Sequence, residues 1–274
     1  MNDAIAPGAE EPPEAPRPRR KGIYILPNAI TLAALFSGFY GIVMAVNGRF
    51  EAACVSIFVA AVLDSLDGRV ARMTNAQSAF GEQMDSLSDM VSFGAAPALI
   101  VYMWALKDMG KLGWIPAFVY ISGAALRLAR FNVNIGVVDK RFFQGLPSPA
   151  AAALVIGMIW VAEDWGLRGG ERPVWLAWGA FGMTLYAGLT MVTNAPFYSF
   201  KVVGARQTVP FAVIVAIAVA MALISQNPPL ALFGLFCLYG LSGYAVYAWR
   251  RMKGKPASVI AISTDEPDEK GLHQ

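Results

Sequence analysis

Histidine is almost absent from this chain: the only one is His273, in a sequence of 274 residues. A Ser–His or Cys–His nucleophile pair and a histidine-rich zinc site are therefore excluded, and no histidine lies in an apolar segment to form a covalent phospho-intermediate. The two cysteines, Cys54 and Cys237, fall in separate apolar segments. We interpret them as small buried hydrophobic residues and not as a disulfide or a metal site. Any catalysis must use carboxylates, basic residues and hydroxyl groups.

Charged residues are also scarce, at 15% of the chain, whereas 56% is hydrophobic and the mean hydropathy is +0.49. A soluble domain carries about 25% charged residues. Several apolar runs approach the roughly 20 residues that a spanning helix needs, and none shows the weak alternation of a β-barrel strand. The sequence therefore predicts an all-α, polytopic membrane bundle of about eight spans: 23–46, 51–73, 83–106, 112–133, 148–166, 174–194, 208–225 and 229–250.

The two ends of the chain differ from this predicted membrane domain, which covers residues 22–253. Residues 1–21 and 254–274 are polar, and we expect both to be disordered tails. With eight spans and both ends in the cytoplasm, 17 of the 22 lysine and arginine residues lie on the cytoplasmic side. The positive-inside rule favours this topology, in a membrane of the bacterial cytoplasmic (inner) type. The net charge of +3 is then explained by topology and anionic lipid surfaces, and nothing indicates nucleic-acid binding.

Four aspartates interrupt the second and third predicted spans. Asp64 and Asp67 are three residues apart and Asp85 and Asp89 are four apart, so each pair lies on one face of its helix. Both Asp64 and Asp89 lie about 12 Å from the turn that joins the two helices. An antiparallel pair of helices would place Asp64 level with Asp89 and Asp67 level with Asp85. We expect the four carboxylates to meet in one pocket that faces the cytoplasm.

Ionised groups in a bilayer cost at least a few kcal/mol unless they are solvated, paired or bound to a metal. No lysine is interleaved with these acids, which indicates a cation from outside the chain. Oxygen ligands suit Mg²⁺ or Mn²⁺, and four carboxylates can hold two ions about 4 Å apart, an arrangement that clamps phosphate oxygens. Gly68 leaves space for a phosphate or nucleotide to approach the backbone, and Arg72 lies where it can meet a phosphate at the membrane edge.

The acids belong to a longer pattern, DxxDGxxARx8GxxxDxxxD, which runs from Asp64 to Asp89. This pattern resembles the signature of the CDP-alcohol phosphatidyltransferases. The segments LPNAITLAALFSGFYGI, FGEQMDSLSDMVSFGAAPA, RLARFN and FQGLPSPAAA are similar to the phosphatidylserine synthase branch of that family. The resemblance covers most of residues 23–206, and no position of the signature departs from the pattern.

The resemblance implies transfer of a phosphatidyl group from CDP-diacylglycerol to L-serine, with release of CMP. It implies that Asp64, Asp67 and Asp85 are metal ligands, and that Asp89 is both close to the metal and the general base. The same resemblance assigns the nucleotide site to four signature residues: Gly68, Ala71, Arg72 and Gly81.

Two further pairs of residues are candidates with alternative explanations. Asn28 and Thr31, three apart on the first span, are suited to hydrogen-bonding the nucleotide or its phosphates, although an asparagine after a proline is also an ordinary helix cap. Arg127 and Arg130 share a face of the fourth span near its cytoplasmic end. They are candidates to bind the lipid phosphate or the serine carboxylate, and the alternative is that they are anchors at the membrane surface.

Other functions stay open on the sequence alone. The same chemistry is possible with glycerol phosphate or inositol phosphate as the acceptor, and intramembrane acids also occur in divalent-cation transporters. Gly38 and Gly41 permit close helix pairing, so a homodimer in the lipid membrane is possible. Glu163 and Asp164, at the outer end of the fifth span, are expected to be interface residues.

Overall fold

The computed structural model describes residues 25–133, 142–167, 173–198 and 224–253, with a few positions between 215 and 222. The expected polar tails and most of the predicted span 208–225 lie outside these residues. Within them the chain is almost entirely helical. Its elements are α1 (Ile25–Val46), α2 (Phe50–Met73), α3 (Ala79–Asp89), the π-helical η2 (Met90–Ala95), α4 (Ala96–Val101), the π-helical η3 (Tyr102–Leu106), the 3₁₀-helical η4 (Lys107–Leu112), α5 (Trp114–Val133), β1 (Phe142–Gln144), α6 (Ser148–Asp164), α7 (Val174–Val192), β2 (Pro196–Tyr198) and α9 (Pro228–Met252).

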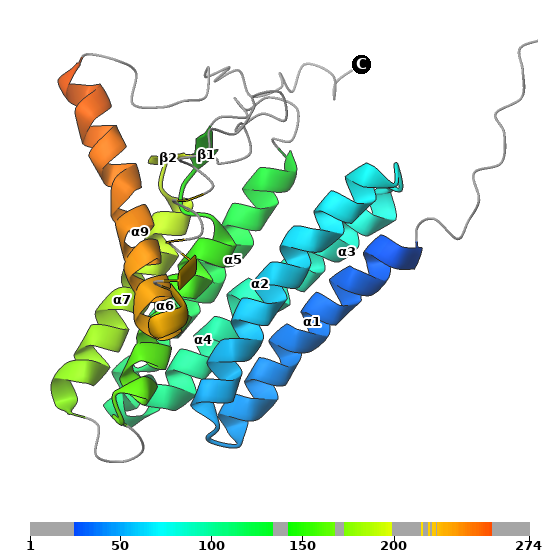
Figure 1. The fold of residues 1–274 in the computed structure, drawn as a ribbon. Helices are drawn as coiled ribbons and strands as arrows, with labels where there is room; N and C mark the ends of the chain where they lie inside the picture. Colours follow the sequence, from blue (N-terminus) through cyan, green and yellow to red (C-terminus); the bar gives the residue numbers. More distant parts are fainter. Residues whose placement is uncertain are drawn as a thin grey trace, which may run out of the picture.

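The helices α1, α2 and α3 lie side by side, with the α1–α2 turn at one end and the α2–α3 turn at the other (Figure 1). Hydroxyl groups join them: Ser37 donates to the backbone oxygen of Ser56 at 2.8 Å. A Cβ atom at Gly38 would lie 2.4 Å from Ser92 Oγ, so α1 approaches η2 more closely than any larger residue allows. Gly41 likewise faces α2. The close helix pairing that these two glycines permit is therefore made within the chain.

The third membrane segment is longer than predicted. It was expected over 83–106, whereas the helix runs from Ala79 to Leu112, 34 residues. Two π-helical turns interrupt it, and the first follows Asp89 directly. A π turn rotates the side chains after it relative to those before it, and such turns are frequent at functional sites. Hydrophobic periodicity assumes 3.6 residues per turn throughout, so it could not predict these π-helical turns.

The short helix α6 forms the centre of the bundle, with α2, α7 and α9 packed around it. Nearly all of its 17 residues are buried, and its run of alanines lets the neighbouring helices approach closely. The helices α5 and α7 cross with their backbones in contact, because a Cβ atom at Gly123 would lie 2.4 Å from the Gly188 oxygen. This crossing lies one turn before Arg127 on α5, and it therefore fixes the position of Arg127 along the bundle axis.

A two-stranded antiparallel ribbon lies at the end of the bundle that holds the α2–α3 turn (Figure 1). In it β1 pairs with β2, and Phe143 stands opposite Phe197. The buried Phe197 ring packs against α9, where a Cβ atom at Gly243 would lie 2.4 Å from its Cζ atom. The ribbon therefore joins the last helix to the rest of the bundle.

Four helical segments are long and apolar enough to cross a membrane, among the residues described: Ile25–Val46, Ala79–Leu112, Val174–Val192 and Pro228–Met252. The helices α2 and α5 also have sufficient length, but they carry the charged residues of the predicted site. These observations agree with a mostly helical integral membrane protein, and the predicted all-α class omitted only the short β1–β2 ribbon among the described residues.

Candidate active site

Three of the four aspartates form a cluster between α2 and α3. One carboxylate oxygen from each of Asp64, Asp67 and Asp85 lies within 4.8 Å of the others. Carboxylate oxygens at this separation fit a single divalent ion, because Mg²⁺ and Mn²⁺ prefer oxygen ligands. The expected meeting of these acids across the α2–α3 turn is confirmed.

The fourth acid, Asp89, lies against this cluster. Its side chain is hydrogen-bonded to Asp64, the residue that the antiparallel arrangement placed level with it, and Asp85 is also near. Two ionised carboxylates repel each other, so their contact requires a shared proton or a cation between them. The other oxygen of the acid, Oδ1, is buried and has no hydrogen-bond partner in the described part of the chain. Such an atom costs free energy unless a ligand supplies a donor.

Asp67 is held in the cluster by burial and by hydrogen bonds. It is 4% exposed, and its Oδ2 atom accepts a hydrogen bond of 2.6 Å from the Thr31 hydroxyl of α1. The Gly68 amide also donates to its carboxylate. Ser88 of α3 donates to the Thr31 backbone oxygen at 3.3 Å. Thr31 thus orients one carboxylate of the cluster and links the three helices that build it, and its binding to the nucleotide stays a prediction.

The remaining signature residues surround the turn between α2 and α3. Among the described residues, a Cβ atom at Gly68 would meet only the guanidinium of Arg72, at 3.5 Å, so the backbone at Gly68 is little covered. At the start of α3, Ser78 Oγ accepts a 3.0 Å bond from the Gly81 amide. A Cβ atom at Gly81 would lie 3.3 Å from Asn28 Oδ1, which brings Asn28 to the same edge. Arg72 is exposed and Ala71 half-buried, beside this edge.

Arg127 and Arg130, one turn apart on α5, differ in their surroundings. Arg127 is directed into the bundle: its Nη1 donates to Ser148 Oγ at 2.9 Å, and its charge interacts with Asp89. Its Nε atom is buried without a partner in the described residues. Arg130 donates through Nη2 to the Val192 oxygen at 3.0 Å, at the C-terminus of α7. A cation there satisfies a free carbonyl of the last helical turn and complements the helix dipole, and the binding of substrate by Arg130 stays a prediction.

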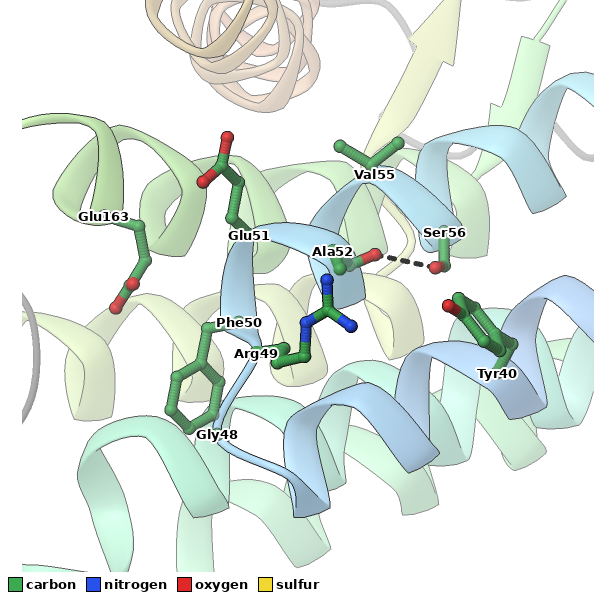
Figure 2. Close-up of a pocket in the computed structure, with 9 residues that line it drawn as sticks. All are labelled: Tyr40, Gly48, Arg49, Phe50, Glu51, Ala52, Val55, Ser56 and Glu163. Atoms are coloured by element: carbon green, nitrogen blue, oxygen red, sulfur yellow. Dashed lines mark hydrogen bonds between the residues drawn. The ribbon is translucent and has the colours of Figure 1, made fainter.

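A separate cavity of about 520 Å³ lies at the opposite end, beside the α1–α2 turn (Figure 2). Arg49, which precedes α2, and Glu51 of α2 line it together with Glu163 of α6. The expectation that Glu163 is an interface residue is wrong: it is 5% exposed and accepts a 2.8 Å bond from Trp104 Nε1. Its position near the end of α6 predicted exposure. The segment that carries Trp104 continues to Leu112, however, and Trp104 contacts Glu163 there. This cavity is remote from the acid cluster.

The fold and the site define a class: a helical membrane protein with a carboxylate cluster, fit for a divalent ion, near one end of its bundle. Comparison with known proteins is more specific. Residues 24–190 match the family model of CDP-alcohol phosphatidyltransferase, and the chain belongs to this family. This enzyme family sets aside the alternative of a cation transporter.

Several relatives carry related names. The chain is 34% identical to a CDP-diacylglycerol–serine O-phosphatidyltransferase of Helicobacter pylori over 221 residues, which are 80% of this chain and 90% of the relative. It is 40% identical to the enzyme of the same name from Mycobacterium leprae over 157 residues, 55% of this chain and 52% of that one. It is also 39% identical over 132 residues to the archaetidylserine synthase of Methanothermobacter thermautotrophicus, 47% of this chain and 55% of the relative.

Proposed function

We propose that the protein transfers a phosphatidyl group from CDP-diacylglycerol to L-serine and releases CMP. The family supports the reaction, and the names of the relatives support serine as the acceptor. The structural observation that carries the proposal is that two buried atoms beside the acid cluster, Asp89 Oδ1 and Arg127 Nε, have no hydrogen-bond partner among the described residues. Asp89 Oδ1 needs a hydrogen-bond donor, and Arg127 Nε needs an acceptor. The hydroxyl and the carboxylate of serine supply both.

In this proposal Asp89 Oδ1 accepts the proton of the serine hydroxyl. The serine oxygen forms a bond to the phosphorus on the lipid side, and the bond from that phosphorus to the CMP oxygen breaks in the same displacement. Arg127 Nε holds the serine carboxylate and so directs the hydroxyl toward Asp89. The displacement needs no covalent phosphatidyl-histidine intermediate, and the sequence has no histidine between residues 22 and 253 to form one.

The carboxylates of Asp64, Asp67 and Asp85 would hold a divalent ion, Mg²⁺ or Mn²⁺, and Asp89 would complete the site for a second. When bound, such ions neutralise the negative charge of the diphosphate and of the leaving CMP. Thr31 keeps Asp67 in place for this task. Ligand carboxylates that are themselves hydrogen-bonded keep one orientation, which raises metal affinity.

The open edge at the α2–α3 turn is proposed as the nucleotide side of the site. Gly68 leaves the backbone accessible there, Gly81 lets the start of α3 lie close to Asn28, and Arg72 adds a positive charge for a phosphate. Asn28, beside Gly81, has an amide suited to the cytosine ring or the ribose. Ala71 is small enough to leave the same edge open.

We further propose eight spans with both termini in the cytoplasm and the acid cluster facing it, in a membrane of the bacterial cytoplasmic type. The excess of lysine and arginine on that side supports this orientation. CDP-diacylglycerol would then enter sideways from the inner leaflet, and serine from the cytoplasm.

The test is purified protein with CDP-diacylglycerol, Mg²⁺ or Mn²⁺, and one acceptor at a time: L-serine, glycerol 3-phosphate or inositol 1-phosphate. CMP release is followed by chromatography and the lipid product by mass spectrometry. We expect serine to give phosphatidylserine, and the phosphorylated acceptors to give less than about a hundredth of that rate. Faster turnover with a phosphorylated acceptor would assign the chain to that reaction instead.

A further inference from the structure

Ser148 is the first residue of α6, and neither the charge pattern nor the motif spacing marks it as functional. Its side chain is fully buried and accepts the 2.9 Å hydrogen bond from Arg127 Nη1. Pro147 precedes it and Pro149 follows it, so the backbone that carries the hydroxyl has little conformational freedom. The hydroxyl is therefore a fixed point at the start of the central helix.

A guanidinium group is planar, and a bond to one of its nitrogens restricts the direction of the others. Ser148 holds Nη1 of Arg127, and this leaves Nε buried and without a partner in the described residues. The charge of Arg127 also interacts with Asp89 on one helix and with Tyr239 on another. Without the bond to Ser148, the Arg127 side chain would populate more rotamers. Binding of the acceptor would then cost the conformational entropy of fixing one of them.

We propose that Ser148 is a positioning residue that aims Arg127 Nε at the carboxylate of the acceptor and so helps to select an amino acid. The proposal rests on the proposed function, because it takes serine as the molecule that Arg127 binds. Ser148 does not touch the reacting atoms: it acts through Arg127. Its removal should weaken the binding of the acceptor and leave that of the liponucleotide unchanged.

The kinetic test compares wild type with Ser148→Ala and Ser148→Cys. Cysteine keeps nearly the packing volume of serine but is a weak acceptor, so it separates packing from hydrogen bonding. Loss of a hydrogen bond to a charged group predicts a rise of at least about tenfold in the KM for serine in both variants, while the KM for CDP-diacylglycerol changes less than about twofold. The matched control is Ser37→Ala, a buried serine that bridges α1 and α2, and we expect its KM values to equal those of wild type. Wild-type kinetics in Ser148→Cys, or equal rises in both KM values, would overturn the proposal.

A second measurement is independent of turnover. In protein labelled with ¹⁵N-arginine, the Arg127 signals are assigned by their loss in Arg127→Lys. We expect slow rotation about the Cζ–Nη bonds in wild type and fast rotation in Ser148→Ala, because the bond that restricts it is gone. Unchanged rotation would refute the positioning role whatever the acceptor. Absence of serine-dependent CMP release from wild type would instead refute the proposed function, and the two failures are thereby distinguished.

Discussion

The substitution Asp89→Asn tests the centre of the proposed mechanism. The amide is nearly the size of the carboxyl group and can donate through Nδ2 to Asp64, where the two acids now contact each other. The fold should therefore be retained, and the repulsion between these two acids is relieved. The amide cannot accept a proton from the serine hydroxyl. Because general base catalysis contributes about 10²–10⁴ in rate, we expect kcat to fall by about that factor.

The assay is CMP release at saturating CDP-diacylglycerol and serine, with the thermal unfolding temperature followed by tryptophan fluorescence. The control is Asp164→Asn, at the exposed end of α6, which should keep both full activity and wild-type stability. An Asp89→Asn protein that folds and releases CMP at more than about a tenth of the wild-type rate would refute the assignment of the base.

Three further substitutions test the metal site and the packing. Asp64→Asn should abolish activity and lower Mn²⁺ affinity by at least about tenfold, measured by electron paramagnetic resonance, and an unchanged affinity would remove Asp64 from the ligand set. Thr31→Val removes the 2.6 Å bond to Asp67, so Mn²⁺ affinity should fall by about 10–100-fold, and loss of activity at wild-type affinity would point to nucleotide binding instead. Gly123→Ala forces a Cβ atom to 2.4 Å from a backbone oxygen of α7 and should cost about 1–3 kcal/mol in denaturation. Gly179→Ala adds a Cβ atom that has no neighbour within 4 Å among the described residues, so it should be neutral or slightly stabilising, and equal losses in both variants would refute the packing argument.

The acid cluster could be predicted because its residues lie on two helices joined by a short turn. In such a hairpin the helix rise and period decide which residues meet, and both are known without the tertiary structure. The contact of Asp64 with Asp89 and the proximity of Asp64, Asp67 and Asp85 follow from this geometry. Hydropathy also predicted six helices with both ends correct to within a few residues: α1, α2, α5, α6, α7 and α9.

The third membrane segment was underestimated for a related reason. Its residues continue as a helix from Ala79 to Leu112, but π-helical turns change the period twice along it. A π turn depends on local packing and leaves no clear mark in the hydrophobic pattern. In the first of these turns, Ser92 packs directly against Gly38 of α1.

By itself, the sequence determined the membrane class, the helix pair that carries the acids, and the family signature, because each depends on residues close together in the chain. Only the tertiary structure decided that Thr31 holds Asp67, that Ser148 holds Arg127, and that Glu163 is buried against Trp104. These partners are 36, 21 and 59 residues apart. Their contacts depend on how whole helices cross, which is set by the summed packing of many small residues and not by any local pattern.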